Sequence, residues 1–390
     1  MNMNEQMKES EESILHTYNR FPVVFEKGQG CYLYDSEGKE YLDFAAGIAV
    51  NSLGYHYPGY DEALKDQIDK LMHISNLYYN PVQTKLAEEI CKASGLSKVF
   101  FGNSGAEANE AMIKLARKYS FDKYGKGRGT VLTLKQSFHG RTLNTLAATG
   151  QEVFHNFFFP FAEGFRYAQP TWEGVQEQLD DSVCGILIEP IQGEGGVCPL
   201  DKEFVQKLAK LCEEKDILLL CDEVQTGIGR TGKLLAAEWF DVRPDVVSLA
   251  KGLGGGLPIG AVLCNEKTQN VLGPSHHGTT FGGNPVVCAG ALVCLGRIAD
   301  PAFLQQVQQK GERIRVALSQ SPEVEDIAGL GMMLGIRLKT KTAKEVANAA
   351  LEAGVLVLTA KEKVRLLPPL TITQEELTQA LDKLLGVLNG

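Results

Sequence analysis

Residues 217–225 of this chain read ILLLCDEVQ, a run of five apolar residues followed at once by two acidic ones. An apolar run of this length is typical of a strand that is buried on both faces of a parallel sheet. Similar short runs recur along the middle of the chain and mostly alternate with helical stretches; they span 99–101, 130–134, 185–188, 246–249 and 260–264. The pattern predicts an α/β fold with a large, mostly parallel sheet between helices.

The flanking stretches predict a second, smaller α+β domain built from both chain ends. Residues 30–44 alternate apolar and polar positions around Ser-Glu-Gly, which indicates a hairpin. A long helical stretch follows Pro285, and the last helix opens with the capping box Thr373-x-x-Glu376. The predicted division is 1–47 for the N-terminal part of the small domain, 48–283 for the large domain, and 284–390 for a linking helix and the C-terminal part of the small domain.

Composition narrows the function classes before any motif is considered. The 390 residues carry a formal net charge of -9, which argues against a nucleic-acid or anionic-membrane partner. The nine cysteines are scattered without a CxxC pair, as expected for reduced thiols. The first residues are polar and acidic, and no apolar run approaches the roughly 20 residues of a membrane span, so neither a secretory signal nor a span is predicted. We expect a cytoplasmic protein.

Lys251 is the most informative single residue. It directly follows the apolar run 246–250 and precedes the glycine-rich run 252–256, where backbone can approach a ligand closely. A lysine that loses hydration there has a lowered pKa, and its neutral amine can form a Schiff base. The alternative is a strand-end lysine that extends to solvent.

Asp222 ends the apolar run 217–221 and has a comparable chemical role. A carboxylate held there could keep a pyridine nitrogen protonated, which makes a pyridoxal ring an electron sink. Gln225, three residues further on, could donate a hydrogen bond to a ring oxygen. The alternative for Asp222 is a cap of the following turn.

Gly105 and Ala106 begin a predicted helix over 106–118, behind the capping pattern Ser104-x-x-Glu107. Small residues at a helix start leave backbone N–H groups open to a phosphate. The stretch matches neither the Walker pattern nor the dinucleotide fingerprint, and an ordinary N-cap without ligand is the alternative. Phe138 follows the strand 130–134, where it could stack on a flat cofactor or simply pack in the core.

Arg141 and Arg365 are two arginines among mainly apolar or small neighbours. Each could bind a carboxylate through its guanidinium fork, and a structural ion pair is the alternative for each. The pair His276-His277 lacks spaced partners, and adjacent side chains cannot easily reach one ion, so no metal site is predicted.

With these residues in place, the chain resembles the class-III, or ω-, aminotransferases of pyridoxal-phosphate fold type I, in particular the acetylornithine aminotransferase branch. The resemblance runs nearly end to end. The motifs that carry it are SGAEANE at 104–110, FHGRT at 138–142, EPIQGEGG at 189–196, DEVQTGIGRTG at 222–232, AKGLGGG at 250–256 and TTFGGNP at 279–285.

The resemblance implies pyridoxal 5'-phosphate as the cofactor and gives each of these motifs a role toward it. Lys251 holds the cofactor covalently and moves the proton, and Asp222 pairs with the pyridine nitrogen. Gln225 lies near the ring oxygen, and Phe138 stacks on the ring. The phosphate is bound by Gly105 and Ala106, joined by Thr280 from a neighbouring subunit.

The same resemblance implies how the substrates are bound. Arg141 and Thr279 contact substrate, and Arg365 takes the carboxylate beside the reacting carbon. Glu189 masks Arg365 when that carboxylate is absent. Because the site is shared, a homodimer is the smallest functional unit.

The implied reaction moves the δ-amine of N-acetylornithine to 2-oxoglutarate and gives N-acetylglutamate 5-semialdehyde and glutamate, a step of arginine biosynthesis. Other ω-aminotransferases, acting on ornithine, succinylornithine or 4-aminobutyrate, are the nearest alternatives. A pyridoxal-phosphate mutase or racemase, or a non-catalytic α/β binding protein in which Lys251 and Asp222 are incidental, are more distant ones.

Overall fold

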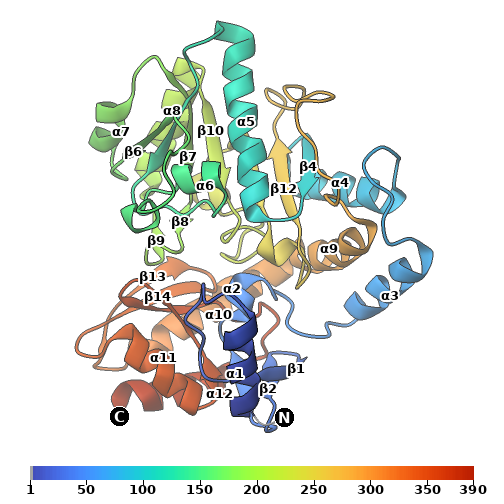
Figure 1. Cartoon of the computed structure of the whole chain (residues 1–390). Helices are drawn as coiled ribbons and strands as arrows, with labels where there is room; N and C mark the ends of the chain where they lie inside the picture. Colours follow the sequence, from blue (N-terminus) through green and yellow to red (C-terminus); the bar gives the residue numbers. More distant parts are fainter. Residues whose placement is uncertain (1–2) are drawn as a thin grey trace.

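The structure, a computed structural model, describes residues 3–390 and is dominated by one seven-stranded sheet (Figure 1). The strand order is β4-β12-β11-β10-β7-β5-β6, and every strand runs parallel to its neighbours except β12, which is antiparallel to both β4 and β11. The strands are β4 (Lys98–Gly102), β5 (Thr130–Leu134), β6 (Phe165–Ala168), β7 (Val183–Ile188), β10 (Leu218–Asp222), β11 (Val246–Leu249) and β12 (Gly260–Cys264). The predicted, largely parallel sheet is confirmed.

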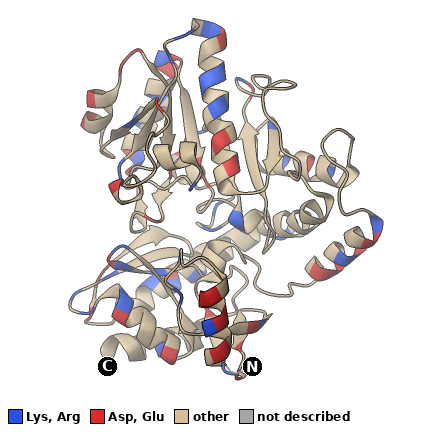
Figure 2. Cartoon of the chain, in the orientation of Figure 1, with Lys and Arg blue, Asp and Glu red and all other residues tan. Residues whose placement is uncertain are grey.

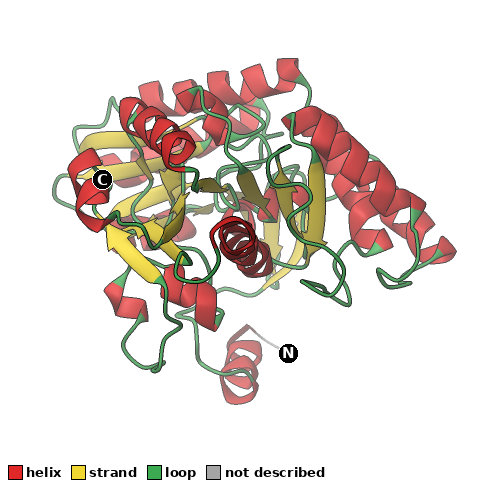
Figure 3. Cartoon of the chain, turned by 90° about the horizontal axis from the view of Figure 1, so that it is seen from above, coloured by secondary structure: helices red, strands yellow, loops and turns green. Residues whose placement is uncertain are grey.

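Both faces of this sheet are buried, which explains the continuous apolar runs. In β10, Leu218 and Leu220 belong to the core cluster that includes helix α5 (Gly105–Tyr124). Leu219 and Cys221 belong to the other cluster, beside α8 (Lys202–Lys215). Helices therefore lie on either side of the strands, as the view from above shows (Figure 3).

Helix α5 confirms the helix predicted over 106–118 and continues it to Tyr124, because Tyr119 and Ser120 extend the buried face. Gly125, at a φ of 72°, ends it. The other helices of this part are α3 (Tyr60–Lys70), α4 (Pro81–Ser94), α6 (Leu143–Ala148), α7 (Trp172–Gln178) and the 3-10 turns Glu152–Phe154, Ala236–Phe240 and Lys251–Leu253. The short strands β8 (Ile191–Gln192) and β9 (Cys198–Pro199) form a separate two-stranded sheet.

The remaining elements bring both chain ends together. The N-terminal strands β1 (Phe25–Gln29), β2 (Tyr32–Asp35) and β3 (Glu40–Asp43) confirm the predicted hairpin, and β15 (Val355–Leu356) from the C-terminal part pairs with β3. A second sheet has the order β13-β14-β17-β16. Its strands are β13 (Val324–Leu330), β14 (Met333–Leu338), β16 (Leu358–Ala360) and β17 (Lys363–Leu366). The boundaries at 47 and 283 stay predictions.

The helices around these two sheets are α1 (Met3–Ser13), the short left-handed turn α2 (Ala46–Ala49), α9 (Pro285–Ile298), α10 (Pro301–Leu318), α11 (Ala343–Glu352) and α12 (Gln374–Asn389). The Thr373 and Glu376 side chains cap α12 as predicted. Within residues 3–390 no single helix is long and apolar enough to cross a membrane; only α9 and α10 together meet that criterion, as a pair bent by 74°. Lysines, arginines and acidic residues are interspersed over both parts of the chain (Figure 2).

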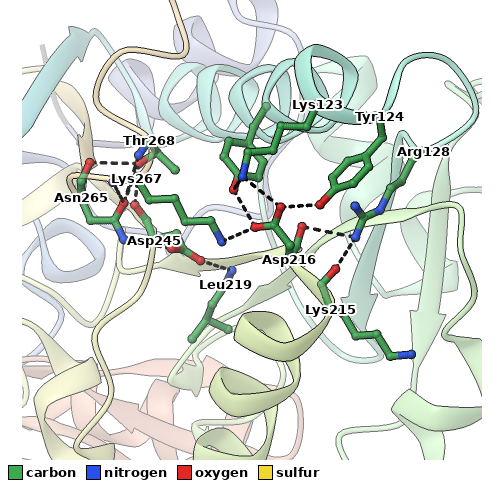
Figure 4. Close-up of polar contacts among 11 residues, drawn as sticks. Lys123, Tyr124, Arg128, Lys215, Asp216, Leu219, Asp245, Asn265, Lys267 and Thr268 are labelled. Carbon is green, nitrogen blue, oxygen red and sulfur yellow. Dashed lines mark hydrogen bonds and ion pairs between the residues drawn. The ribbon is translucent and has the colours of Figure 1, made fainter.

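Asp216 follows α8 and connects it to α5 and to the segment after β12, at one end of the large sheet (Figure 4). Its carboxylate accepts hydrogen bonds from Tyr119 and Tyr124 of α5, and it forms ion pairs with Lys123 at 3.0 Å and Lys267 at 3.1 Å. Burial alone raises the pKa of Asp216, but these hydrogen bonds outweigh it and hold the pKa well below its usual value.

We therefore expect Asp216→Asn to destabilise the protein by about 1–2 kcal/mol at pH 7, because the ionised form carries the contacts and lies partly exposed. Asparagine tolerates the φ of 48° at this position, so the change removes the charge and one acceptor oxygen without straining the backbone. The pKa of Asp216 is lower in the folded state than in the unfolded state, so its contribution to the free energy of unfolding is complete above the unfolded-state pKa of about 3.9. That contribution is lost as the pH falls through the lower, folded-state pKa.

Urea unfolding of wild type and variant, at pH 7 and at pH 3, measures this difference. Asp241→Asn is the matched control: Asp241 has a φ of 54°, also follows a helical turn, and forms an ion pair with the exposed Lys202. An equal loss of stability in both variants would contradict the role of Asp216.

Candidate active site

A cavity of about 490 Å³ opens at the carboxyl ends of the parallel strands of the large sheet. This is where open α/β sheets bind their ligands. Most of the predicted site residues line it; they are Gly105, Ala106, Phe138, Arg141, Glu189, Asp222, Gln225 and Lys251. The structure thus brings together residues that are up to 146 positions apart in the sequence.

Lys251 enters the cavity directly after β11, in the first position of a 3-10 turn. Burial lowers the pKa of its amine, and the nearby carboxylates of Glu194 and Asp222 only partly oppose this. The following Gly252 packs closely on Ser52, because a Cβ there would lie 2.5 Å from Ser52 Oγ and would displace that hydroxyl. Lys251 is therefore held where it has a larger neutral fraction than an exposed lysine.

Asp222 is almost fully buried, and its Oδ2 has two side-chain partners. Asn109 Nδ2 donates to it at 2.7 Å, and His139 Nδ1 lies 2.8 Å away. Ser248 Oγ in turn donates to Asn109 Oδ1 at 2.7 Å. Among the residues that the structure describes, Asp222 Oδ1 accepts only from the Val224 backbone N–H, so this carboxylate is fixed in place facing the cavity.

Asn109, His139 and Ser248 were not predicted as site residues. Asn109 offers a signal in hindsight: it is a buried amide on a helix face otherwise occupied by alanine and apolar residues. His139 lies within the FHGRT motif, but its pairing with Asp222 spans 83 positions. The pairing of either residue with Asp222 is not visible from local sequence alone.

The helix start at Gly105 has the geometry of an anion site. Ser104 Oγ caps the Glu107 N–H at 3.1 Å, and the first N–H groups of a helix have no partner within it. A Cβ on Gly105 would lie 2.7 Å from Val224, so only glycine fits. The Glu107 carboxylate accepts from the Asn103 N–H at 2.7 Å.

The structure corrects the predicted partner of Arg365. Arg365 Nη1 lies 2.5 Å from Glu194 Oε1, not on Glu189. Glu194 belongs to the turn between β8 and β9, which reaches β17, whereas Glu189 directly follows β7. Burial raises the pKa of Glu194, but the charge and hydrogen bond of Arg365, together with Lys251 and Gln225, outweigh it, and the pKa lies below its ordinary value. Glu194 is therefore the carboxylate that covers Arg365.

Glu189 has a different environment from the one predicted. It accepts hydrogen bonds from the backbone N–H groups of Phe138 at 2.9 Å and Gly193 at 3.4 Å. Burial raises its pKa well above the ordinary value, and the charge of Asp222 adds to this. Glu189 lines the cavity and fixes the backbone at Phe138.

Gln225 connects the cavity to the Arg365–Glu194 pair. Its Oε1 accepts from Arg365 Nη1 at 3.2 Å, and its Nε2 donates to Glu194 Oε1 at 3.3 Å. Because Gln225 lines the cavity while its amide contacts both charged groups, a ligand that reaches Gln225 lies next to the ion pair.

Thr279 and Thr280 do not line the cavity of their own chain. Thr279 Oγ1 accepts from Asn103 Nδ2 at 3.1 Å, and Thr280 is exposed. Their predicted roles in substrate and phosphate binding stay predictions. Across residues 3–390 no group of three His, Cys, Asp or Glu side chains could hold a metal ion, and His277 Nδ1 lies 2.9 Å from Lys114 Nζ.

The cavity fits pyridoxal 5'-phosphate group by group. The helix start with its obligatory Gly105 suits the phosphate, and the fixed carboxylate of Asp222 suits a protonated pyridine nitrogen. Phe138 offers a ring face, and Lys251 an amine of lowered pKa for the aldehyde. All four groups face one space of suitable size.

Comparisons with known proteins agree with this geometry. The family model described as "Aminotransferase class-III" matches residues 14–388. The chain is 48% identical to the acetylornithine aminotransferase of Haemophilus ducreyi over 379 residues, which cover 96% of each protein.

Two solved structures extend the comparison to the fold. The ornithine aminotransferase of Toxoplasma gondii superimposes with a TM-score of 0.95 at 31% identity, covering 100% of this chain and 95% of that one. The N-acetylornithine aminotransferase of Stenotrophomonas maltophilia gives 0.84 at 36% identity, covering 96% and 97%. The fold and the cavity residues thus lead to the same conclusion as these relatives: the chain belongs to the class-III aminotransferases and is a pyridoxal-phosphate-dependent transaminase.

Proposed function

We propose that the enzyme transfers the δ-amine of N-acetylornithine to 2-oxoglutarate, giving N-acetylglutamate 5-semialdehyde and glutamate, as a cytoplasmic step of arginine biosynthesis. The observation that carries the proposal is the different state of two arginines, Arg141 in the lining of the cavity and Arg365 next to it, in contact with the cavity-lining Gln225. Arg141 forms no ion pair with any residue the structure describes, whereas Arg365 is covered by Glu194. The near full-length similarity to an acetylornithine aminotransferase supports the same substrate.

The chemistry of the two substrates calls for two such arginines. N-Acetylornithine reacts at a terminal carbon, so its one carboxylate lies far from the reaction. 2-Oxoglutarate carries one carboxylate beside the reacting carbon and one far from it. In our proposal Arg141 takes the distal carboxylate in both half-reactions, and Arg365 takes the proximal one only after Glu194 has moved away.

Bound pyridoxal 5'-phosphate supplies a ring that withdraws electrons from the carbon bearing the amine. Lys251 Nζ takes the proton from that carbon and returns it elsewhere, which its lowered pKa permits. Asp222 would pair with the ring nitrogen, and Asn109 and His139 fix the orientation of its carboxylate. Glu189 positions the backbone at Phe138.

We also propose that the enzyme acts as a homodimer. Asn76 donates to the backbone oxygens of Thr279 and Gly282, which joins segment 76–79 to the loop carrying Thr280. Around this junction Leu77, Tyr79 and Phe281 are exposed, Tyr79 fully so. Apolar surface gathered beside a predicted site residue favours burial against a second copy of the chain.

A panel of amine donors with 2-oxoglutarate tests the substrate. N-Acetylornithine should give the highest kcat/KM, ahead of ornithine, succinylornithine and 4-aminobutyrate. Ornithine is the second candidate, because the ornithine aminotransferase of Toxoplasma gondii has so similar a fold. A clear preference for ornithine would reject N-acetylornithine as the substrate and identify the enzyme as an ornithine aminotransferase.

Arg365→Ala should affect one half-reaction only. A charge-assisted contact contributes about 1.5–3 kcal/mol, or roughly 10- to 150-fold in an equilibrium constant. We expect the half-reaction with 2-oxoglutarate to weaken by about that factor, while amine transfer from N-acetylornithine stays nearly intact. Single-turnover measurements of each half-reaction check this, with Arg141→Ala as the comparison that should damage both. Equal losses in both halves for Arg365→Ala would reject the assignment.

A further inference from the structure

Phe154 covers the guanidinium of Arg141 at the edge of the cavity. The Cζ atom of Arg141 lies 3.9 Å from the centroid of the Phe154 ring and 5.4 Å from that of Phe138. The two rings meet edge to face, with centroids 5.9 Å apart and an interplanar angle of 74°. Arg141 thus packs against two aromatic rings, and one of them, Phe138, lines the cavity.

The surrounding segment holds Phe154 in place. Gln151, just before the 3-10 turn, is buried and donates through Nε2 to the Ser137 backbone oxygen at 3.1 Å. His155, just after Phe154, donates through Nε2 to the Leu146 oxygen at 2.9 Å. Phe154 is half-buried, while Phe157 on the same loop is 81% exposed. The ring is therefore anchored on both sides.

The two arginines are held by opposite means. Arg365 is held by a carboxylate, which must leave before another anion can bind. Arg141 is held by a ring face, and across residues 3–390 no carboxylate pairs with it. A ring stacked on the flat side of a guanidinium leaves the N–H groups in its plane free for a carboxylate. Arg141 is thus restrained without a competing anion.

We propose that Phe154 is a positioning residue that pre-organises Arg141 for the distal carboxylate of both substrates. The inference rests on the proposed function, because it needs Arg141 to bind that carboxylate. Pre-organisation reduces the conformational freedom that an exposed arginine loses on binding. Phe154 therefore acts on carboxylate affinity in both half-reactions and not on the proton transfer at Lys251.

Phe154→Leu removes the ring and keeps an apolar side chain. We expect the KM values for N-acetylornithine and 2-oxoglutarate both to rise about 3- to 10-fold, the range of an aromatic–cation contact. The kcat should change by less than about twofold. Phe154→Tyr, which keeps the ring, should restore both KM values, and Phe157→Leu on the same loop should leave them at wild-type values.

Glutarate gives a readout that does not depend on turnover. It is a dicarboxylate of the same chain length as 2-oxoglutarate without the reacting carbonyl. Calorimetric titration of the holoenzyme should show its Kd rising in Phe154→Leu by the same factor as KM, with the melting temperature checked for each variant. An unchanged Kd in a folded Phe154→Leu protein would overturn the inference, even if the donor panel supports the proposed function.

A double-mutant cycle tests whether Phe154 acts through Arg141. In an Arg141→Ala background, Phe154→Leu should cause no further loss of glutarate affinity, because the group that it positions is gone. If the two losses multiply, Phe154 acts independently and the inference fails. If wild type converts neither N-acetylornithine nor 2-oxoglutarate, the proposed function fails instead, and this outcome is separate from the cycle.

Discussion

Lys251→Ala is expected to abolish turnover while the protein still folds and retains pyridoxal 5'-phosphate without a covalent link. Alanine lacks both the nucleophile and the proton carrier, and general acid–base catalysis alone contributes about 10²- to 10⁴-fold. The phosphate site at Gly105 and the carboxylate of Asp222 are untouched, so binding of the cofactor persists. Burial of the amine already costs stability, so the fold should not suffer from its removal.

Borohydride reduction followed by peptide mass spectrometry measures the covalent link. Wild type should carry the reduced cofactor on Lys251, and Lys251→Ala should carry none. Lys135→Ala is the matched control, because Lys135 directly follows β5 at the same edge of the sheet but is exposed. Full activity of Lys251→Ala, or a link to another lysine, would refute the assignment.

The sequence predicts the central sheet well because burial on both faces leaves a direct trace in the residues. It misses two features of that sheet. β6 carries Arg166, which pairs with Asp180 at 2.7 Å, and an edge strand with one neighbour need not be wholly apolar. The direction of β12 is not written in its apolar run; the clue is the connection 250–259, too short for a helical crossover between parallel strands.

In the candidate site, too, some features follow from the local sequence and others depend on long-range contacts. Lys251, Asp222 and Gly105 can be identified as candidate site residues from the sequence, because each lies at the end of an apolar strand or at the start of a helix. The partner of Arg365 is not local: Glu189 and Glu194 lie in one motif, and only the course of β8 and β9 decides which of them reaches β17. A sequence motif gives the residue types, whereas the pairing depends on how the loop folds.

Two further groups of residues depend on contacts that sequence reasoning does not reach. The support of Asp222 by Asn109 joins residues 113 positions apart, between the end of β10 and helix α5. Thr280 lies outside its own cavity, so its predicted role depends on a second chain. In both cases the chemistry of the side chain is compatible with several partners, and only the tertiary or quaternary arrangement selects one.

Asp222→Asn should slow proton abstraction about 100- to 1,000-fold or more while the protein keeps its cofactor. The carboxylate supplies the charge that keeps the ring nitrogen protonated, and an amide of nearly the same size does not. Removing one fixed electrostatic group at a site of developing charge has effects of this size. Cofactor binding persists because the phosphate is held at the start of α5, away from the substituted group.

Variants of Asp222 and of its neighbours are expected to lose different amounts of rate. This difference separates an electrostatic role of Asp222 from a structural one. Asparagine keeps one oxygen for Asn109 and His139 and gives up only the weaker acceptor of the Val224 N–H at 3.0 Å. Ser248→Ala leaves Asp222 intact and removes one of the hydrogen bonds that orient Asn109, which still donates to the His139 backbone oxygen. Ser248→Ala should therefore slow the amine half-reaction in stopped flow by about 10-fold or less, the equivalent of one hydrogen bond. Near-normal half-reaction rates in Asp222→Asn would refute the charge as the origin of the effect. Equal losses in the two variants would instead assign the effect to the hydrogen-bond network that orients the carboxylate.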